Sequence, residues 1–248
     1  LPRQSGKSTV VTAYLLWYAI FNDNVNIAIL ANKAATAREM LGRLQLSYEN
    51  LPKWLQQGVV NWNRGSLELE NGSKILAAST SASAVRGMSF NIIFLDEFAF
   101  IPTHIADEFF SSVYPTISSG KSTKVIIIST PKGMNMFYKL WHDAEKGQNE
   151  YTTTEVHWQQ VPGRDAKWKE ETIRNTSEEQ FNQEFECEFL GSVNTLISST
   201  KLKTLIYEEP IKKEAGLSVY EDPVEGHSYH ICVDVARGLT KDYSAFTV

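Results

Sequence analysis

The stretch Asn91-Ile92-Ile93-Phe94-Leu95-Asp96-Glu97 is an apolar run that ends in two adjacent carboxylates. A short apolar run of this kind predicts a buried strand, with Asp96 and Glu97 at its carboxyl end. In ATPases built on a phosphate-binding loop, the first acid at this position binds Mg²⁺ through water, and the second orients and activates the attacking water. A buried strand followed by two solvated acids is the plainer alternative, and this stretch alone does not decide between them.

A second motif lies at the start of the chain, where Gly6-Lys7-Ser8 precedes a predicted helix over residues 8–20. Backbone N–H groups and the helix N-terminus can hold phosphate oxygens, Lys7 can reach the terminal phosphates, and the Ser8 hydroxyl can bind Mg²⁺. The full pattern has a glycine five residues before Gly6, where Leu1 stands, so the string alone is weak evidence. Both motifs in this order favour a phosphate-loop ATPase.

Apolar strands alternate with helical segments over the first part of the chain. We expect strands at residues 26–30, 91–95 and 124–128 and near 151–157, with a hairpin over 66–78 that turns at Asn71-Gly72. We expect helices at residues 8–20, 103–117, 135–146, 166–175 and 178–188, and one from its N-cap Asn32 to about Leu51. This order predicts an α/β fold with a mostly parallel sheet flanked by helices.

The composition excludes several other classes of protein. Of 248 residues, 42% are hydrophobic and 21% charged, which is not typical of disordered chains, collagen-like repeats or coiled coils. The 24 Lys and Arg against 29 Asp and Glu give a net charge of -5, so only a local basic face would bind nucleic acid. Cys187 and Cys232 lack metal-ligand spacing and fit a reducing cytoplasm, and the longest apolar run is too short to cross a membrane.

Three segments differ in pattern. Residues 1–190 form the predicted ATPase domain, residues 191–226 are rich in turn residues and read as a linker or small subdomain, and residues 227–248 begin a fresh hairpin with strands at 229–235 and 244–248. The loop starts almost at Leu1, so we expect the chain to lack the strand that precedes such a loop. Asp234 interrupts an apolar strand, either as an edge-strand acid paired with Arg237 or Lys241 or as a metal ligand.

Four motifs together resemble the large terminase subunit of tailed bacteriophages, the motor that packages DNA into the empty capsid: Arg3-Gln4-x-Gly6-Lys7-Ser8, Ala84-Val85-Arg86-Gly87, Leu95-Asp96-Glu97-Phe98-Ala99-Phe100-Ile101-Pro102 and Ser129-Thr130-Pro131. The Arg-Gln loop without the first glycine is typical of that family. Phe181-Asn182-Gln183-Glu184 and Thr195-Leu196-Ile197-Ser198 resemble the end of its ATPase domain and its linker. The resemblance covers essentially the whole chain. It implies a P-loop ATPase domain, a linker and the first hairpin of an RNase H-like nuclease domain.

The resemblance also implies roles for matching residues. Glu97 is the expected catalytic carboxylate, Asp96 and Ser8 the expected Mg²⁺ ligands, and the expected ATP-binding residues are Arg3, Gln4, Ser5, Gly6, Lys7, Ser8 and Thr9. Arg3 is the family's phosphate-loop arginine and has an expected catalytic role. Arg86 would reach the nucleotide of a neighbouring subunit, although a surface arginine on a Ser-rich loop is the alternative. Ser129, Thr130 and Pro131 match the motif that couples hydrolysis to movement.

In the intact protein, the resemblance implies a nuclease that uses Mg²⁺ or Mn²⁺ to cut concatemeric DNA, with Asp234 and Asp242 among its metal ligands. Further acidic ligands of the family lie beyond Val248, so we do not expect this chain to cut DNA. The expected partners are double-stranded DNA, the portal protein and the small terminase subunit. The expected assembly is a homo-oligomeric ring on the capsid and a monomer in isolation, in the host cytoplasm and transiently on the procapsid, without a membrane. Another P-loop translocase or helicase, or a nucleotide-binding switch without translocation, remains an alternative.

Overall fold

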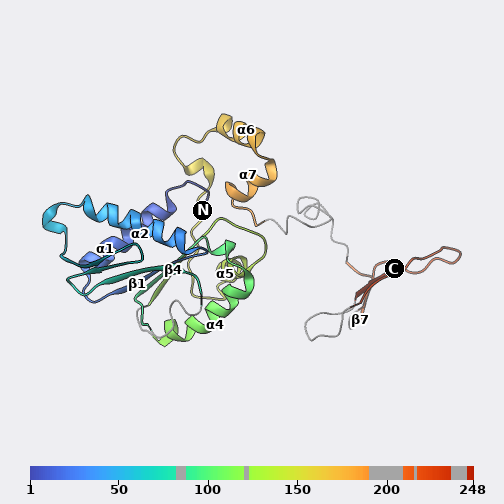
Figure 1. Ribbon diagram of the computed structural model, residues 1–248. Coiled ribbons are helices and arrows are strands. Elements are labelled where there is room, and N and C mark those ends of the chain that lie inside the picture. The colour runs from blue at the N-terminus through green and yellow to red at the C-terminus, as the bar shows by residue number, and fades with distance from the viewer. Residues whose placement is uncertain (82–87, 120–122, 190–208, 215–216, 236–244) are drawn as a thin grey trace. The chain divides into compact units, whose positions relative to one another are not determined.

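A computed structural model describes residues 1–81, 88–119, 123–189, 209–214, 217–235 and 245–248 (Figure 1). The chain divides into two units, Leu1–Ser199 and Thr200–Val248. The first unit carries the phosphate-loop motif and the Asp96-Glu97 motif. The second contains short antiparallel strand pairs and Asp234.

A sheet with strand order β2-β3-β4-β1-β5-β6 forms the centre of the first unit's described residues. Its parallel part consists of β4 (Lys74–Ser79), β1 (Asn26–Ala31), β5 (Ile92–Asp96) and β6 (Lys124–Ile128). At the other edge, β2 (Val59–Trp62) and β3 (Ser66–Leu69) continue the sheet in antiparallel fashion. β3 and β4 are joined through Asn71-Gly72, where Gly72 has a φ of +80°, so the predicted hairpin is confirmed.

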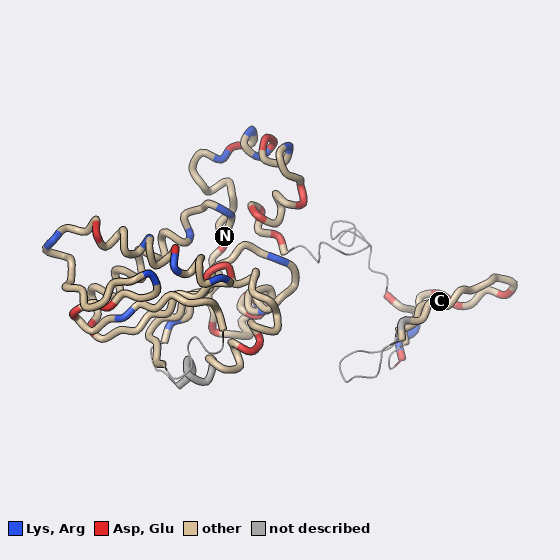
Figure 2. Tube along the Cα trace, in the orientation of Figure 1, with Lys and Arg blue, Asp and Glu red and all other residues tan. Residues whose placement is uncertain are grey.

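Helices cover both faces of this sheet (Figure 1). The helices are α1 (Lys7–Phe21), α2 (Ala34–Glu49), α4 (Thr103–Ser119), α5 (Met136–Glu145), α6 (Ala166–Asn175) and α7 (Glu178–Glu184). Short 3-10 helices are η1 (Lys53–Leu55), η2 (Phe98–Phe100) and η3 (Trp158–Gln160). Basic and acidic residues are interspersed along the first unit (Figure 2), so charge alone does not define a DNA-contact surface. None of the helices in the described part of the chain has the length and apolar character needed to cross a membrane.

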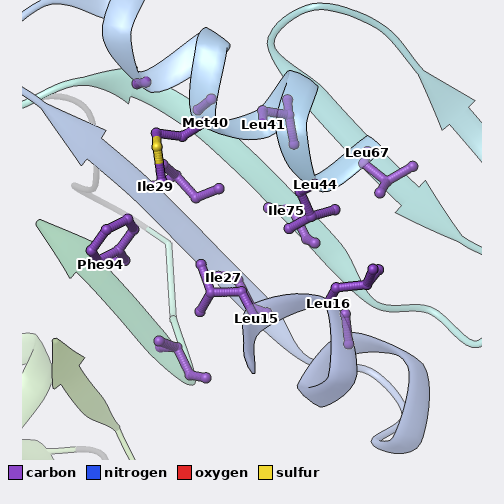
Figure 3. Packing of buried hydrophobic residues seen from close by; sticks show 14 of the residues in the cluster. Leu15, Leu16, Ile27, Ile29, Met40, Leu41, Leu44, Leu67, Ile75 and Phe94 are labelled. Atoms are coloured by element: carbon purple, nitrogen blue, oxygen red, sulfur yellow. The ribbon is translucent and has the colours of Figure 1, made fainter. Parts of the chain in front are cut away.

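The side chains of β1 and β5 alternate between two apolar clusters. Ile27, Ile29 and Phe94 pack with α1 and α2 on one face, together with Leu15, Leu41 and Leu44 (Figure 3). Ala28, Leu30, Ile93 and Leu95 pack on the other face with Phe109 of α4 and Phe137 of α5. Both strands are buried on both faces, as expected of parallel strands between helical layers. The predicted α/β fold with a mostly parallel sheet is therefore confirmed.

Three local predictions are wrong. Residues 151–157 form no strand and pair with no strand of the sheet; residues 150–154 line a cavity of about 520 Å³ together with residues of β6. The helix predicted to reach residue 188 ends at Glu184, because the backbone leaves helical geometry at Phe185 and Cys187 has a φ of +59°. The N-cap of α2 is Lys33 rather than Asn32, with no side-chain capping bond among the described residues.

The second unit contains two antiparallel pairs among its described residues. β7 (Lys212–Glu214) pairs with β8 (Leu217–Val219) inside the predicted linker. β9 (Cys232–Asp234) pairs with β10 (Ala245–Thr247), and Asp234 lies opposite Ala245. The β9–β10 pair agrees with the two predicted strands but is too short to identify a fold, and the β7–β8 pair was not predicted. The RNase H-like hairpin and the domain boundaries after residues 190 and 226 stay predictions.

Candidate functional site

The loop before α1 has the backbone geometry of a compact turn. Gly6, the N-cap of α1, has a φ of +78°, and Gln4 has a φ of +55°. The Ser5 hydroxyl closes the turn by donating to the carbonyl of Pro2 at 2.8 Å. No described side chain caps the N-terminus of α1, and its first turn holds no acidic residue. The N–H groups of this helix start are therefore suited to an anionic ligand such as a phosphate.

A cavity of about 660 Å³ opens beside this loop, within the size range of small-molecule sites. The structure brings together at its walls all seven residues predicted to bind ATP: Arg3, Gln4, Ser5, Gly6, Lys7, Ser8 and Thr9. Glu97 and Thr130 line the same cavity from the ends of β5 and β6. Residues that are far apart in the sequence thus converge on one space, although their chemical roles stay predictions.

The two carboxylates after β5 differ in environment. Asp96 is buried, and its Oδ1 accepts the backbone N–H of Glu97 at 3.0 Å. Glu97 is exposed and has a φ of +52°, so the chain turns sharply there into η2. Glu97 lines the cavity, whereas the buried Asp96 is not among the residues that line it. One acid is therefore shielded from solvent and the other is accessible.

Ser129 connects the end of β6 to the segment that follows Glu97. Its buried hydroxyl accepts the backbone N–H of Ala99 at 3.0 Å and donates to the carbonyl of Thr130 at 2.7 Å. Thr130 lines the cavity, whereas Ser129 and Pro131 do not. The Ser129-Thr130-Pro131 segment is thereby linked through one hydroxyl to the turn that carries the carboxylates.

Burial opposes the charges of Lys7 and Asp96. Burial lowers the pKa of the Lys7 ammonium, while the negative charge of Asp96 acts in the opposite direction; Lys7 Nζ donates to the carbonyl of Leu1 at 3.3 Å. Burial, followed by the charge of Glu97, raises the pKa of Asp96, which the N–H of Glu97 and the charge of Lys7 partly offset. A ligand that carries both an anion and a cation would stabilise the charged forms of both groups.

The oxygen donors at this site suit Mg²⁺ bound together with phosphates. Mg²⁺ prefers hard oxygen ligands and is typically held by one or two carboxylates plus substrate phosphates. Ser8 and Asp96 supply such oxygens, and the described residues contain no cluster of three or more His, Cys, Asp or Glu that would hold a metal alone. The oxygens of Ser8 and Asp96 therefore fit, by their chemistry, a cation bound together with phosphates.

Sequence reasoning missed several residues of the cavity wall: Asn32, Lys33, Thr36, Arg43, Phe100 and Glu184. The start of α2 reaches the site because β1 lies beside β5 in the sheet. Asn32 and Lys33 could have been predicted as site residues, because they are polar residues that directly follow the buried strand β1. Glu184 is buried at the end of α7, accepts the N–H of Arg3 at its carbonyl at 2.9 Å, and places Oε1 3.8 Å from the Arg3 guanidinium.

The remaining predicted residues are not assembled into this site. Arg86 and Asp242 lie outside the described residues. Asp234 belongs to β9 in the second unit, and only its backbone is described. Their predicted roles as an arginine finger and as nuclease ligands therefore stay predictions.

A phosphate-type loop leads into a helix with one buried face, and the carboxylates Asp96 and Glu97 stand at the end of a strand in a mostly parallel sheet. Together these features define the P-loop NTPase fold. Within that class, the chain matches the family model of the terminase large subunit, T4likevirus type, N-terminal part, over residues 1–204. The chain therefore belongs to the terminase large subunit family.

Two relatives are terminase large subunits, one from Thermus virus P23-45 and one from Thermus phage G20c. Each is 27% identical over 280 aligned positions, which cover 100% of this chain and 56% of the relative. The chain thus spans little more than half the length of these relatives.

Solved structures share the fold. The large terminase ATPase domain of Thermus phage P74-26 has a TM-score of 0.59 and 24% identity, covering 76% of this chain and 86% of that chain. The HK97 bacteriophage large terminase has a TM-score of 0.60 and 19% identity, covering 76% and 45%. The large terminase of another thermophilic bacteriophage, solved in complex with ADP, has a TM-score of 0.58 and 13% identity, covering 76% and 46%.

The raised pKa of Asp96 gives a testable pH dependence. The folded chain binds the proton of this carboxyl more tightly than the unfolded chain does. Protonation therefore stabilises the folded state at acidic pH, and this contribution to the free energy of unfolding is lost as the pH rises through the folded-state pKa. We expect Asp96→Asn to raise the free energy of unfolding at neutral pH by about 1 kcal/mol, the scale of burying a poorly compensated polar group. Urea denaturation in EDTA measures this change.

The gain should shrink as the pH falls below the folded-state pKa and should vanish below about pH 3, because the wild-type carboxyl is then protonated in both states. Asp107→Asn, at an exposed position on α4, is the matched control and should change stability by less than about 0.5 kcal/mol. A gain in Asp96→Asn that grows on acidification would contradict the assignment.

Proposed function

We propose that this chain is the ATP-hydrolysing part of a motor subunit that translocates double-stranded DNA into a phage capsid. The observation that carries the proposal is the cavity in which the loop residues Arg3 to Thr9 face Glu97 and Thr130. Membership of the terminase large subunit family gives this site its biological setting. The large terminase of a thermophilic bacteriophage has been solved with ADP and with ATP-gamma-S, which supports a nucleotide as the ligand.

The chain's own residues divide the binding of MgATP between them. Lys7, the loop N–H groups and the N-terminus of α1 hold the phosphates, since they supply positive charge at the phosphate loop that lines the cavity. Ser8 and Asp96 would hold the cation that accompanies the phosphates, and a cation held there would offset negative charge on the phosphoryl group. Arg3, exposed at the wall, adds positive charge there.

Glu97 acts as the base that orients and activates the attacking water. It is the exposed member of the carboxylate pair, it lines the cavity, and the sharp turn at its backbone fixes its direction. The buried Asp96 is less suited to this role, because its oxygen already accepts the N–H of Glu97. The two acids thus separate cation binding from general-base catalysis.

Coupling to movement would pass through Thr130 and Ser129. Thr130 lines the cavity and can report whether the terminal phosphate is present, while Ser129 holds the N–H of Ala99 next to the catalytic turn. A change at the phosphate therefore acts on the end of β6 and on η2 together, with Pro131 restricting the backbone beyond them.

The finer parts of the proposal follow from the family. Arg86 would complete the nucleotide site of a neighbouring subunit in a ring, and Asp234 and Asp242 would bind Mg²⁺ or Mn²⁺ in a nuclease of the intact protein. Double-stranded DNA, the portal protein and the small terminase subunit would be the partners, on the procapsid in the host cytoplasm. Hydrolysis stimulated by duplex DNA separates this function from a nucleotide switch, which should not respond to DNA.

The role of Glu97 as the base can be tested by one substitution. In the intact protein, Glu97→Gln should keep binding MgATP but lower DNA-stimulated turnover by about 10²–10⁴-fold, the usual contribution of a general base. Phosphate release and calorimetric titration measure the two quantities. Glu108→Gln, at an exposed site on α4, is the control and should turn over normally. Near-normal hydrolysis by Glu97→Gln would remove Glu97 from the mechanism.

The action of Arg86 between subunits can be tested by mixing variants. Subunits with Arg86→Ala and subunits with Glu97→Gln should each hydrolyse ATP poorly, because an arginine finger contributes about 10³–10⁵-fold. Mixing them should recover part of the activity at interfaces where an intact arginine meets an intact site. Assembly without recovery at any mixing ratio would favour a surface arginine or a role within one subunit.

The proposed nuclease role of Asp234 predicts a separate loss of function. In the intact protein, Asp234→Ala should abolish plasmid nicking in Mn²⁺, because two-metal cleavage depends on its carboxylate ligands. ATP hydrolysis should be retained, which distinguishes loss of a metal ligand from general unfolding. Unchanged nicking would show that Asp234 is only an edge-strand acid.

A further inference from the structure

Arg164, in the segment between η3 and α6, reaches across to the phosphate loop. Its Nη2 donates to the backbone carbonyl of Arg3 at 2.6 Å and lies 3.3 Å from the carbonyl of Gln4. These are contacts from a charged donor to main-chain oxygens that are distant in sequence, with a separation of 161 between Arg164 and Arg3. These bonds hold the loop backbone independently of the conformations of the loop side chains.

An aromatic cluster fixes the direction of the Arg164 side chain. The guanidinium carbon lies 4.8 Å from the ring centre of Trp168 and 5.3 Å from that of Phe185. Those two rings are 5.1 Å apart and nearly perpendicular, and both contact Phe181. A guanidinium between two rings of this kind gains cation–π attraction and loses rotational freedom.

The same helical segment holds the other side of the loop. Glu184, directly before Phe185, accepts the N–H of Arg3 at its backbone carbonyl. Arg3 is therefore fixed at its N–H by the end of α7 and at its carbonyl by Arg164. A residue held at both ends cannot rotate without breaking one of these bonds.

The loop requires such support because of Gln4. Its φ of +55° lies in the left-handed region, which is unfavourable for a residue other than glycine and persists where neighbours impose it. The carbonyls that Arg164 contacts are those of Gln4 and of the residue before it. Arg164 Nη1 is buried with no hydrogen-bond partner within the described residues. The side chain thus bonds to the loop carbonyls through Nη2 while its Nη1 donor stays unpaired, which is unfavourable for a buried group.

We propose that Arg164 is a positioning residue that holds the phosphate loop in its binding-competent conformation and so couples nucleotide affinity to the α6–α7 segment. This inference rests on the proposed nucleotide site, because its consequence is expressed as affinity for the phosphates. Coupling is reciprocal, so nucleotide bound at the loop should in turn stabilise α6 and α7.

The test compares MgADP binding by wild type and by Arg164→Ala in the intact protein, measured by calorimetry. We expect the variant to bind about tenfold more weakly, which corresponds to about 1.4 kcal/mol. Its KM for ATP should rise by a larger factor than its kcat falls, because the loop can still reach the productive conformation. In hydrogen exchange, MgADP should protect α6 and α7 in wild type and protect them less in the variant.

Two further variants keep the test decisive. Lys167→Ala removes a positive charge from the exposed start of α6, where Lys167 lies 4.0 Å from Glu171, and should bind MgADP as wild type does. Arg164→Lys keeps a charged donor but not the planar fork, and should recover part of the affinity. If Arg164→Ala does not fold, weaker binding by a stably folded Arg164→Lys carries the inference.

Each outcome has a defined meaning. Binding of MgADP by wild type, Arg164→Ala and Arg164→Lys with equal affinity overturns the positioning role and leaves the proposed function intact. Equal losses in Arg164→Ala and Lys167→Ala overturn it as well, since a general charge effect would then explain both. Failure of the wild-type protein to bind MgADP overturns the proposed function and this inference together.

Discussion

The parallel register of β1, β5 and β6 is the constraint on which the site depends. Asp96 pairs with Ala31 on one side and with Ile128 on the other, so three strands end at the same level. The chain therefore leaves the sheet at neighbouring points, where polar residues can follow without entering the apolar layers. If β5 slipped by one residue, its side chains would exchange faces and Asp96 would no longer lie between Ala31 and Ile128.

The electrostatics of the site follow from that placement. Lys7 and Asp96 are opposite charges that burial disfavours individually and that partly compensate each other. Such a pair is poor evidence for stability, since desolvation offsets much of the attraction. Under the proposed function the pair would serve binding instead, because a phosphate and its cation would each find a partner of opposite charge.

Much of this architecture could be predicted from the sequence, for physical reasons. The local composition of residues 91–97 predicts a buried strand that ends in acids, and the helix after Gly6 is likewise predicted from neighbouring residues alone. The prediction failed at residues 151–157, where strand-like composition meets no ladder partner. Glu184 and Arg164 were missed because they reach the loop by tertiary packing of a distant segment. A helix-end acid and a loop arginine carry no local signal of such contacts.

Strand β1 also has a consequence for how far such sequences can diverge. Ile27 and Ile29 belong to one apolar layer, whereas Ala28 and Leu30 belong to the other, and the strand backbone separates the two. Compensating exchanges of side-chain volume can therefore accumulate within one layer while the other stays as it is. Exchanges confined to one layer leave the backbone hydrogen bonds of the sheet unchanged. They offer a physical route by which chains only 24% identical retain the same fold.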